Sequence, residues 1–162
     1  MAVLKIRVNP DPVLRKKAKK VTSLDDSVQK LIDDMIDTLH DSQGVGLAAN
    51  QVGVPLRIVV IHIPDDKDVM VLINPEVVER TGERRVVEGC LSIPGYQAEL
   101  TRAHSVKVKA KDRNGKLVRK KASDNLMAHC LEHEIDHLNG ILYIDYLKDT
   151  DELIKTENEL DE

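Results

Sequence analysis

The chain has 162 residues, a length that suits a single domain with a hydrophobic core. Its net charge of −4 and its lack of Phe and Trp argue against direct reading of nucleic acid, which usually needs a basic surface and aromatic stacking platforms. No uncharged apolar run reaches membrane-spanning length, and residues 1–8 lack the apolar region of a secretory signal. We therefore expect a cytoplasmic protein that does not bind membranes.

The N-terminal part of the chain predicts a short strand and then an amphipathic helix. Residues 3–8 alternate in the manner of a strand. Residues 24–42 carry apolar side chains at helical spacing, and Asp25 and Asp26 stand near the start, where negative charge favours a helix. We expect this helix to serve as scaffold.

A run of small residues follows the helix, at positions 44–51 (GVGLAANQ). Such a run lets the backbone come close to a ligand or to another element, and the amide of Gln51 could donate a hydrogen bond to an oxygen atom. The alternative is a tight helix exit built from small packing residues. Taken alone, the run favours that alternative.

Val- and Ile-rich segments in the middle of the chain predict strands joined by tight turns. Asn114 and Gly115 form a strong hairpin signal between two of these segments. Each segment pairs most simply with the next one along the chain, which predicts three hairpins. The expected strands are 57–63, 69–73, 76–80, 83–87, 106–110 and 117–122.

The strongest chemical signal is the string HEIDH at residues 133–137. Residues four apart lie on one face of a helix, so His133 and His137 can offer two imidazole nitrogens to one divalent ion. Glu134 would then stand beside the ion, in a position to take a proton from a metal-bound water. A third ligand is still needed.

The surrounding stretch 123–139 reads as a helix whose start can be capped by Ser123 or Asp124. The two histidines fall on its apolar stripe, and Glu132 falls on the opposite face, where we expect solvent. The predicted fold class is therefore α+β, with mostly antiparallel strands packed around this central metal-binding helix and an N-terminal amphipathic helix over about 24–42.

The two cysteines, Cys90 and Cys130, could pair in principle. In a reducing compartment, however, a free thiol and a metal thiolate are more typical than a disulfide. Cys90 lies in residues 88–92 (EGCLS), where it could ligate a metal, although a lone cysteine is more often a small core residue.

Together, residues 44–51, 88–92 and 133–137 resemble the three signature motifs of the peptide deformylases, in the same order. The resemblance begins near Pro10 and extends to about Leu147. It implies a metal-dependent hydrolase that removes the formyl group from the N-terminal formylmethionine of nascent polypeptides and releases formate.

The resemblance also implies roles for individual residues. The metal ligands would be Cys90, His133 and His137, with Cys130 as a structural thiol. Glu134 would be the general base, and the Gln51 amide and the Leu91 backbone N–H would donate hydrogen bonds to the oxyanion. The implied ion is Fe²⁺, with Zn²⁺, Ni²⁺ or Co²⁺ as substitutes.

The methionine side chain of such a substrate needs an apolar slot. His129 departs from the family pattern, which usually has an aliphatic residue there; it could be a packed or rim-facing side chain, or else a ligand or acid/base group. Arg102 could hold the peptide or pair with a carboxylate such as Asp136. The expected substrate-binding residues are Gly44, Val45, Gly46, Val86, Leu126, His129, Cys130 and Arg102.

We expect residues 1–147 to form a single catalytic domain and residues 148–162 an acidic tail, in a monomeric protein. The tail has seven acidic residues against two lysines and reads as a solvated or frayed helix. Family members thought to dock at the ribosome use a basic C-terminal helix. Repulsion from ribosomal RNA should therefore leave only weak ribosome association.

Two other functions compete with this interpretation. The first is an H-E-x-x-H metallopeptidase, which normally takes its third ligand from His or Glu, so that Cys90 within its motif argues against it. The second is a deformylase-like protein that has lost catalysis and only holds peptide N-termini. All motif positions with assigned chemistry are filled here, which argues against that loss.

Overall fold

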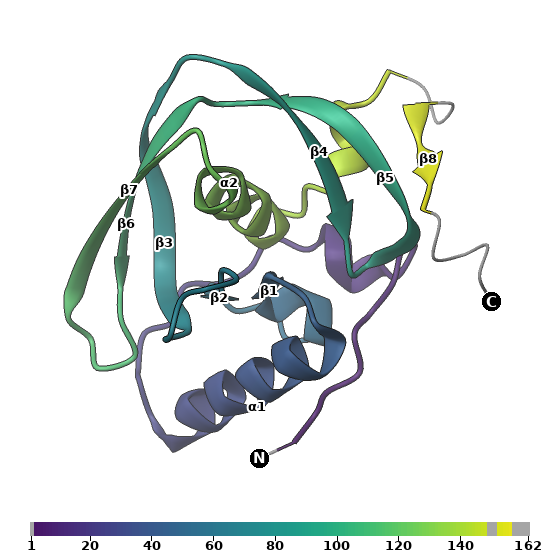
Figure 1. Cartoon of the computed structure of the whole chain (residues 1–162). Helices are drawn as coiled ribbons and strands as arrows, with labels where there is room; N and C mark the ends of the chain where they lie inside the picture. Colours follow the sequence, from purple (N-terminus) through teal and green to yellow (C-terminus); the bar gives the residue numbers. More distant parts are fainter. Residues whose placement is uncertain (1, 149–151, 157–162) are drawn as a thin grey trace.

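The computed structural model describes residues 2–148 and 152–156 and confirms the predicted α+β class. The helix α2 (Leu126–Leu138) lies between a five-stranded and a three-stranded antiparallel sheet, and α1 (Asp26–Ser42) packs at one end (Figure 1).

The strand order is β1-β2-β3-β6-β7 in the five-stranded sheet and β4-β5-β8 in the three-stranded sheet. The strands are β1 (Gly46–Ala48), β2 (Ile58–Ile61), β3 (Met70–Thr81), β4 (Arg84–Cys90), β5 (Ile93–Arg102), β6 (Ser105–Lys111), β7 (Leu117–Ser123) and β8 (Ile154–Lys155). The described residues also include the short 3-10 helices η1 (Pro12–Arg15), η2 (Ala49–Val52) and η3 (Tyr143–Tyr146).

Two of the three predicted hairpins are confirmed. β2 pairs with β3, and β6 pairs with β7 across the turn at Gly115. The third prediction, a hairpin of β3 and β4, is wrong, because β3 pairs with β6 whereas β4 pairs with β5 in the other sheet. The reason is tertiary: Val86 of β4 belongs to a separate core cluster with Leu100 and Tyr143, and the chain must change sheets to bury it there.

The strand predicted over residues 3–8 is also wrong. Its backbone is bonded to other groups instead of to a strand ladder: Leu4 N–H donates to Thr38 Oγ1 over 2.8 Å, and Arg7 N–H donates to the Gln51 carbonyl over 2.7 Å. An extended segment can satisfy its polar groups in this way without joining a sheet. The segment thereby packs beside α1 and η2.

The N-terminal helix is confirmed as α1. Asp25 caps it by accepting a hydrogen bond from Val28 N–H over 3.0 Å. The apolar face of α1 packs against β1 and β2 and buries side chains of these two strands of the five-stranded sheet. The glycine-rich residues 44–46 follow shortly after the C-terminal end of α1.

The central helix is confirmed too, but its cap and its outer face differ from the prediction. Asn125 is the cap, accepting from Ala128 N–H over 2.9 Å, because Asp124 has a left-handed backbone (φ 49°) and turns the chain just before it. Glu132 is buried, and accepts from Ala103 N–H over 2.8 Å and from Arg80 Nε over 3.1 Å. With sheets on both sides, α2 has no outer face for Glu132 to occupy (Figure 1).

The described part of the tail forms a strand, not the expected helix. Ile154 and Lys155 make up β8 and pair with Gln97 and Tyr96 of β5. The rest of the predicted tail, residues 149–151 and 157–162, lies outside the described residues. Within the described parts of the chain, no helix is both long and apolar enough to cross a membrane.

Candidate metal centre and substrate cavity

Three side chains of the predicted metal site meet between β4 and α2. Cys90 ends β4, while His133 and His137 lie one turn apart on α2. The Cys90 Sγ lies 3.3 Å from His137 Nε2, which lies 3.2 Å from His133 Nε2. Their ligand atoms all fall within 4.8 Å of one another. The chain therefore brings one sulfur and two nitrogens to a single point.

The hydrogen bonds of His133 fix which of its nitrogens faces this point. Its Nδ1 lies 2.7 Å from Glu88 Oε1, and a carboxylate can only accept, so Nδ1 carries a proton and Nε2 is the nitrogen that can bind an ion. Burial lowers the pKa of His137, which keeps that imidazole neutral, whereas for His133 the hydrogen bonds with Cys90 and Glu88 outweigh burial and raise the pKa. With an ion bound in place of the His133 Nε2 proton and the Cys90 thiol proton, two neutral imidazoles and a thiolate would form a ligand set that fits Zn²⁺ or Fe²⁺.

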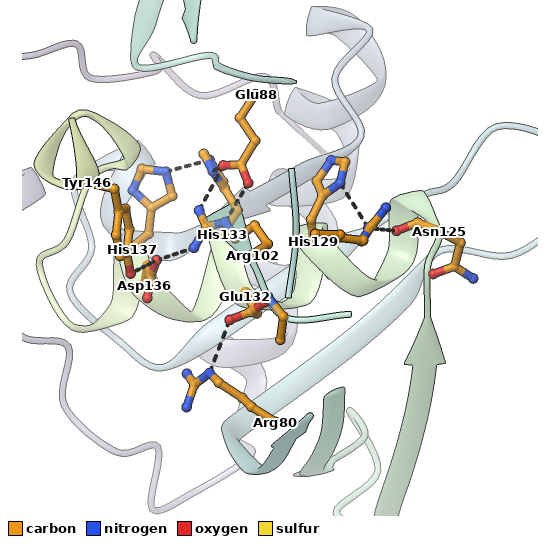
Figure 2. A network of polar contacts seen from close by, with 12 residues as sticks. Arg80, Glu88, Arg102, Asn125, His129, Glu132, His133, Asp136, His137 and Tyr146 are labelled. Atoms are coloured by element: carbon orange, nitrogen blue, oxygen red, sulfur yellow. Dashed lines mark hydrogen bonds and ion pairs between the residues drawn. The ribbon is translucent and has the colours of Figure 1, made fainter. Parts of the chain in front are cut away.

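Behind His133, a buried ionic network holds Glu88 in place (Figure 2). Arg102 donates to both Glu88 oxygens, over 2.5 and 2.8 Å, and to Asp136 Oδ2 over 2.8 Å. Tyr146 donates to the same Asp136 oxygen over 2.7 Å. Burial alone raises the pKa of Glu88, but the hydrogen bonds from Arg102 and His133 outweigh it and lower the pKa to about 2. Glu88 is therefore a carboxylate at neutral pH.

This network corrects one predicted role and confirms its alternative. Arg102 is 4% exposed and pairs with Glu88 and Asp136, so it is not among the residues that line the cavity beside the metal site. Each of its three guanidinium nitrogens donates to a buried carboxylate, which holds Arg102 inside the protein and away from a peptide bound in the cavity. The predicted pairing with Asp136 is present.

Glu134 lies beside the three possible ligands and is buried. Burial raises the pKa of its carboxyl to about 7. Its Oε1 has no hydrogen-bond partner within the described residues, and a Cβ added at Gly46 would stand 2.6 Å from its Oε2. Strand β1 thus passes directly against Glu134, which explains why position 46 holds a glycine.

Gln51, in η2, is held rigidly beside Cys90. Its Oε1 accepts from Ala48 N–H over 2.9 Å, while its Nε2 donates to Ser92 Oγ over 3.1 Å and lies 3.7 Å from Cys90 Sγ. The amide N–H groups, and not the oxygen, are therefore turned toward the thiol. A donor in that place can meet an oxygen of a ligand bound near Cys90.

The sequence did not single out Asn50, which has a structural role at this site. Its side chain is fully buried, and its Nδ2 donates to the carbonyl oxygens of His137, over 3.0 Å, and of Lys16, over 2.8 Å. It thereby ties η2 to the end of α2. The only signal in the sequence is that a polar residue stands within an otherwise small and apolar run.

A cavity of about 370 Å³ opens beside these groups. Val86 was expected in its wall but instead points into the core, and its neighbour Val87 lines the cavity, because successive side chains of a strand point to opposite faces. The predicted site residues that do line it are Gly44, Val45, Gly46, Gln51, Cys90, Leu91, Leu126, His129, Cys130, His133 and Glu134.

The second cysteine, Cys130, lies in this wall as a free thiol, and Cys90 is also free. Burial raises the pKa of Cys130, so this thiol stays protonated. It lies outside the group of three ligand atoms. Its geometry therefore agrees with an apolar wall residue.

Comparisons with known proteins show the family to which the chain is similar. Residues 3–152 match the family described as "Polypeptide deformylase". The chain is 58% identical over 153 residues to the peptide deformylase of Dehalococcoides mccartyi strain CBDB1, covering 94% of this chain and 91% of that protein. It is similar to the crystal structure of a peptide deformylase from Legionella pneumophila, with a TM-score of 0.88 and 51% identity over 91% of this chain and 87% of the other. The Ehrlichia chaffeensis peptide deformylase in complex with actinonin gives 0.89 and 39% identity over 94% and 92%.

Proposed function

The chain belongs to the polypeptide deformylase family, as its three motifs predicted, and we propose that Cys90, His133 and His137 hold the ion of this metal-dependent hydrolase. Its reaction is the removal of the N-formyl group from the N-terminal formylmethionine of nascent polypeptides, with release of formate. The observation that carries the assignment is the convergence of one thiol and two imidazoles within 4.8 Å beside a buried carboxylate.

An ion at this point would supply a Lewis acid that polarises the formyl group and lowers the pKa of water. Three protein ligands, rather than four, are typical of catalytic ions. The residues of the chain then supply proton transfer, hydrogen bonds to the developing charge, and a slot for the first side chain. No covalent intermediate with the protein is needed.

Glu134 has the properties of the group that moves the proton. A carboxyl whose pKa is raised to about 7 by burial can both take a proton from the attacking water and give it to the leaving amine nitrogen near neutral pH. The unpaired Oε1 supports this role, since no other residue within the described parts of the chain competes for it. The two transfers use the same carboxyl in turn.

Gln51 and the Leu91 backbone N–H are proposed to stabilise the oxyanion that forms when water attacks the formyl carbon. Gln51 Nε2 is turned toward Cys90, and Ala48 and Ser92 hold the amide in that orientation before any substrate arrives. Preorganised donors of this kind cost no reorganisation in the transition state.

The apolar part of the cavity is proposed to bind the methionine side chain. Val45, Leu126 and Cys130 line it, and an unbranched thioether can bury itself among them, which stabilises by roughly 1.5 to 3 kcal/mol. The metallopeptidase alternative is not favoured, since the third candidate ligand is a thiol and the family match covers nearly the whole chain.

The identity of the ion and the cellular setting are also proposals. The ligand set suits Fe²⁺ and Zn²⁺ alike, and we propose Fe²⁺ as the working ion, with Zn²⁺, Ni²⁺ or Co²⁺ able to replace it. We further propose a monomer that acts in the cytoplasm, where nascent chains emerge. Its acidic C-terminal residues would leave only weak association with the ribosome.

The test is to measure formate release from a formyl-Met tripeptide by protein loaded with Fe²⁺ under anaerobic conditions. An internally quenched, unformylated peptide is offered in parallel. We expect formate from the first and no cleavage of the second. Cleavage of the second without release of formate from the first would support the metallopeptidase instead.

A further inference from the structure

His129 is an imidazole in a wall that is otherwise mostly apolar. It lies on α2 one turn before His133, with Leu126 and Cys130 as neighbours in the lining of the cavity. It is not one of the three converging ligand atoms. A polar ring in this slot therefore has to be explained by something other than the metal.

A neighbouring arginine determines the tautomer of His129. Arg84 Nη2 lies 3.4 Å from His129 Nδ1, and also donates to the Asn125 carbonyl over 2.5 Å. A guanidinium can only donate, so Nδ1 must offer its lone pair. Burial lowers the pKa of His129, which keeps the ring neutral. The single ring proton is therefore on Nε2.

Arg84 is itself held firmly, which makes this tautomer a fixed property of the slot. Its side chain is only 18% exposed, and Asp124 Oδ1 lies 3.6 Å from its Nη1. Its partners Asp124 and Asn125 lie directly before α2, the helix that carries His129. The pair Arg84 and His129 thus belongs to the same rigid framework as the candidate ligands.

The other nitrogen of His129, Nε2, has no hydrogen-bond partner within residues 2–148 and 152–156. We propose that this Nε2–H is a hydrogen-bond donor to the first side chain of the substrate, and that it lets the slot accept N-formyl peptides beginning with methionine sulfoxide. The inference rests on the proposed deformylase function and names a further substrate class for the same site.

The chemistry of three side chains of nearly equal length leads to this class. Norleucine has no acceptor, the thioether of methionine is a weak acceptor, and the sulfoxide oxygen is a strong one. An aliphatic wall would bury the sulfoxide without a partner, which is costly. A fixed donor in the wall removes that penalty for the sulfoxide. In a slot whose walls are all aliphatic, the penalty would remain.

The test compares three formyl peptides that differ only in the first residue: norleucine, methionine or methionine sulfoxide. The quantity measured is kcat/KM for the sulfoxide divided by kcat/KM for norleucine. We expect His129→Leu to lower this ratio roughly 2- to 12-fold, the range of one neutral hydrogen bond, with methionine affected less. An unchanged ratio in His129→Leu protein with full metal content would overturn the inference.

A matched pair of arginine variants tests the part played by the tautomer. Arg84→Met should also lower the ratio, because the freed Nδ1 can then take the proton from Nε2. Arg85→Met should keep the wild-type ratio, since Arg85 pairs with Glu99 on an exposed surface. Equal ratios in both arginine variants would contradict the role of Arg84, and melting temperatures would show whether either is unfolded.

A failure of the proposed deformylase function would give a different result from a failure of this inference. If none of the three formyl peptides releases formate, the function fails, and the inference is then decided by binding of the same peptides to metal-loaded protein. The ratio of dissociation constants for the sulfoxide and norleucine peptides should shift by the same factor in His129→Leu. No shift in binding would reject the inference independently of turnover.

Discussion

Glu88 accepts a hydrogen bond from His133 Nδ1 over 2.7 Å, and stands two residues before Cys90 on the same strand. One strand therefore supplies both a candidate ligand and the carboxylate that orients another. Because Arg102 is bonded to both oxygens of Glu88, the direction of the His133 lone pair depends on a network that reaches Tyr146. Partners of this kind usually matter nearly as much as the ligands themselves.

Replacing Glu88 should weaken metal binding without touching a ligand. In Glu88→Gln the neutral amide no longer fixes the His133 tautomer and leaves Arg102 short of one countercharge, so we expect metal affinity to fall about 10- to 100-fold. The measurement is competition with a chelator of known affinity. Glu99→Gln is the control, because Glu99 is exposed and pairs with Arg85. Equal affinities in the two variants would contradict the orienting role.

The same carboxylate predicts a pH dependence of stability. Its pKa of about 2 in the folded protein lies below the ordinary value of 4.5, so its contribution is present above pH 4.5 and is lost as the pH falls toward 2. The contribution is about 3 kcal/mol. The free energy of unfolding, measured with urea, should differ between wild type and Glu88→Gln above pH 4.5. This difference should become smaller as the pH falls toward 2. A difference that stays constant with pH would show that the charge is not its source.

The proton-transfer role of Glu134 predicts a loss of turnover without a loss of metal. Glu134→Gln has nearly the same shape but cannot take a proton, so kcat should fall roughly 10²- to 10⁴-fold. Metal analysis of the same sample should give wild-type content. Near-native turnover by a metal-loaded Glu134→Gln protein would remove Glu134 from the mechanism.

The close approach of β1 to Glu134 predicts that a single methyl group is harmful. In Gly46→Ala the new Cβ would stand 2.6 Å from Glu134 Oε2, so the carboxylate must move and turnover should fall at least tenfold. If the effect acts through Glu134, adding Gly46→Ala to Glu134→Gln should cause little further loss. Additive losses in the double variant would instead indicate an independent effect on the cavity.

Local chemistry made much of this fold predictable. The hairpin at Gly115 follows from its turn residues, and α1 and α2 follow from helical periodicity and polar residues at their starts. The three motifs indicated the residues that meet at the site, because two imidazoles at helical spacing and one cysteine have few other uses together. Their roles as ligands, base and oxyanion donors are predictions that still need the experiments above.

The features that the sequence did not predict depend on contacts between distant segments. Glu132 is buried because Arg80 of β3 and the backbone of Ala103, between β5 and β6, cover its side of α2, which periodicity within one helix does not reveal. Val86 was expected to line the cavity, but Val87 lines it and Val86 lies in the core, because a shift of one residue along a strand moves a side chain to the opposite face. Glu88, the partner of Arg102 that the sequence did not predict, lies 14 residues away from it.

The central claim is that one ion, held by Cys90, His133 and His137, is needed for deformylation. The most direct measurement is formate release from a formyl-Met peptide while metal-stripped protein is titrated with Fe²⁺ in the absence of air. We predict no release without metal, a rise that ends at one equivalent, the same end point for Cys130→Ser, and a weak or absent rise for Cys90→Ser. Full activity in the stripped protein, or a wild-type titration by Cys90→Ser, would contradict the account.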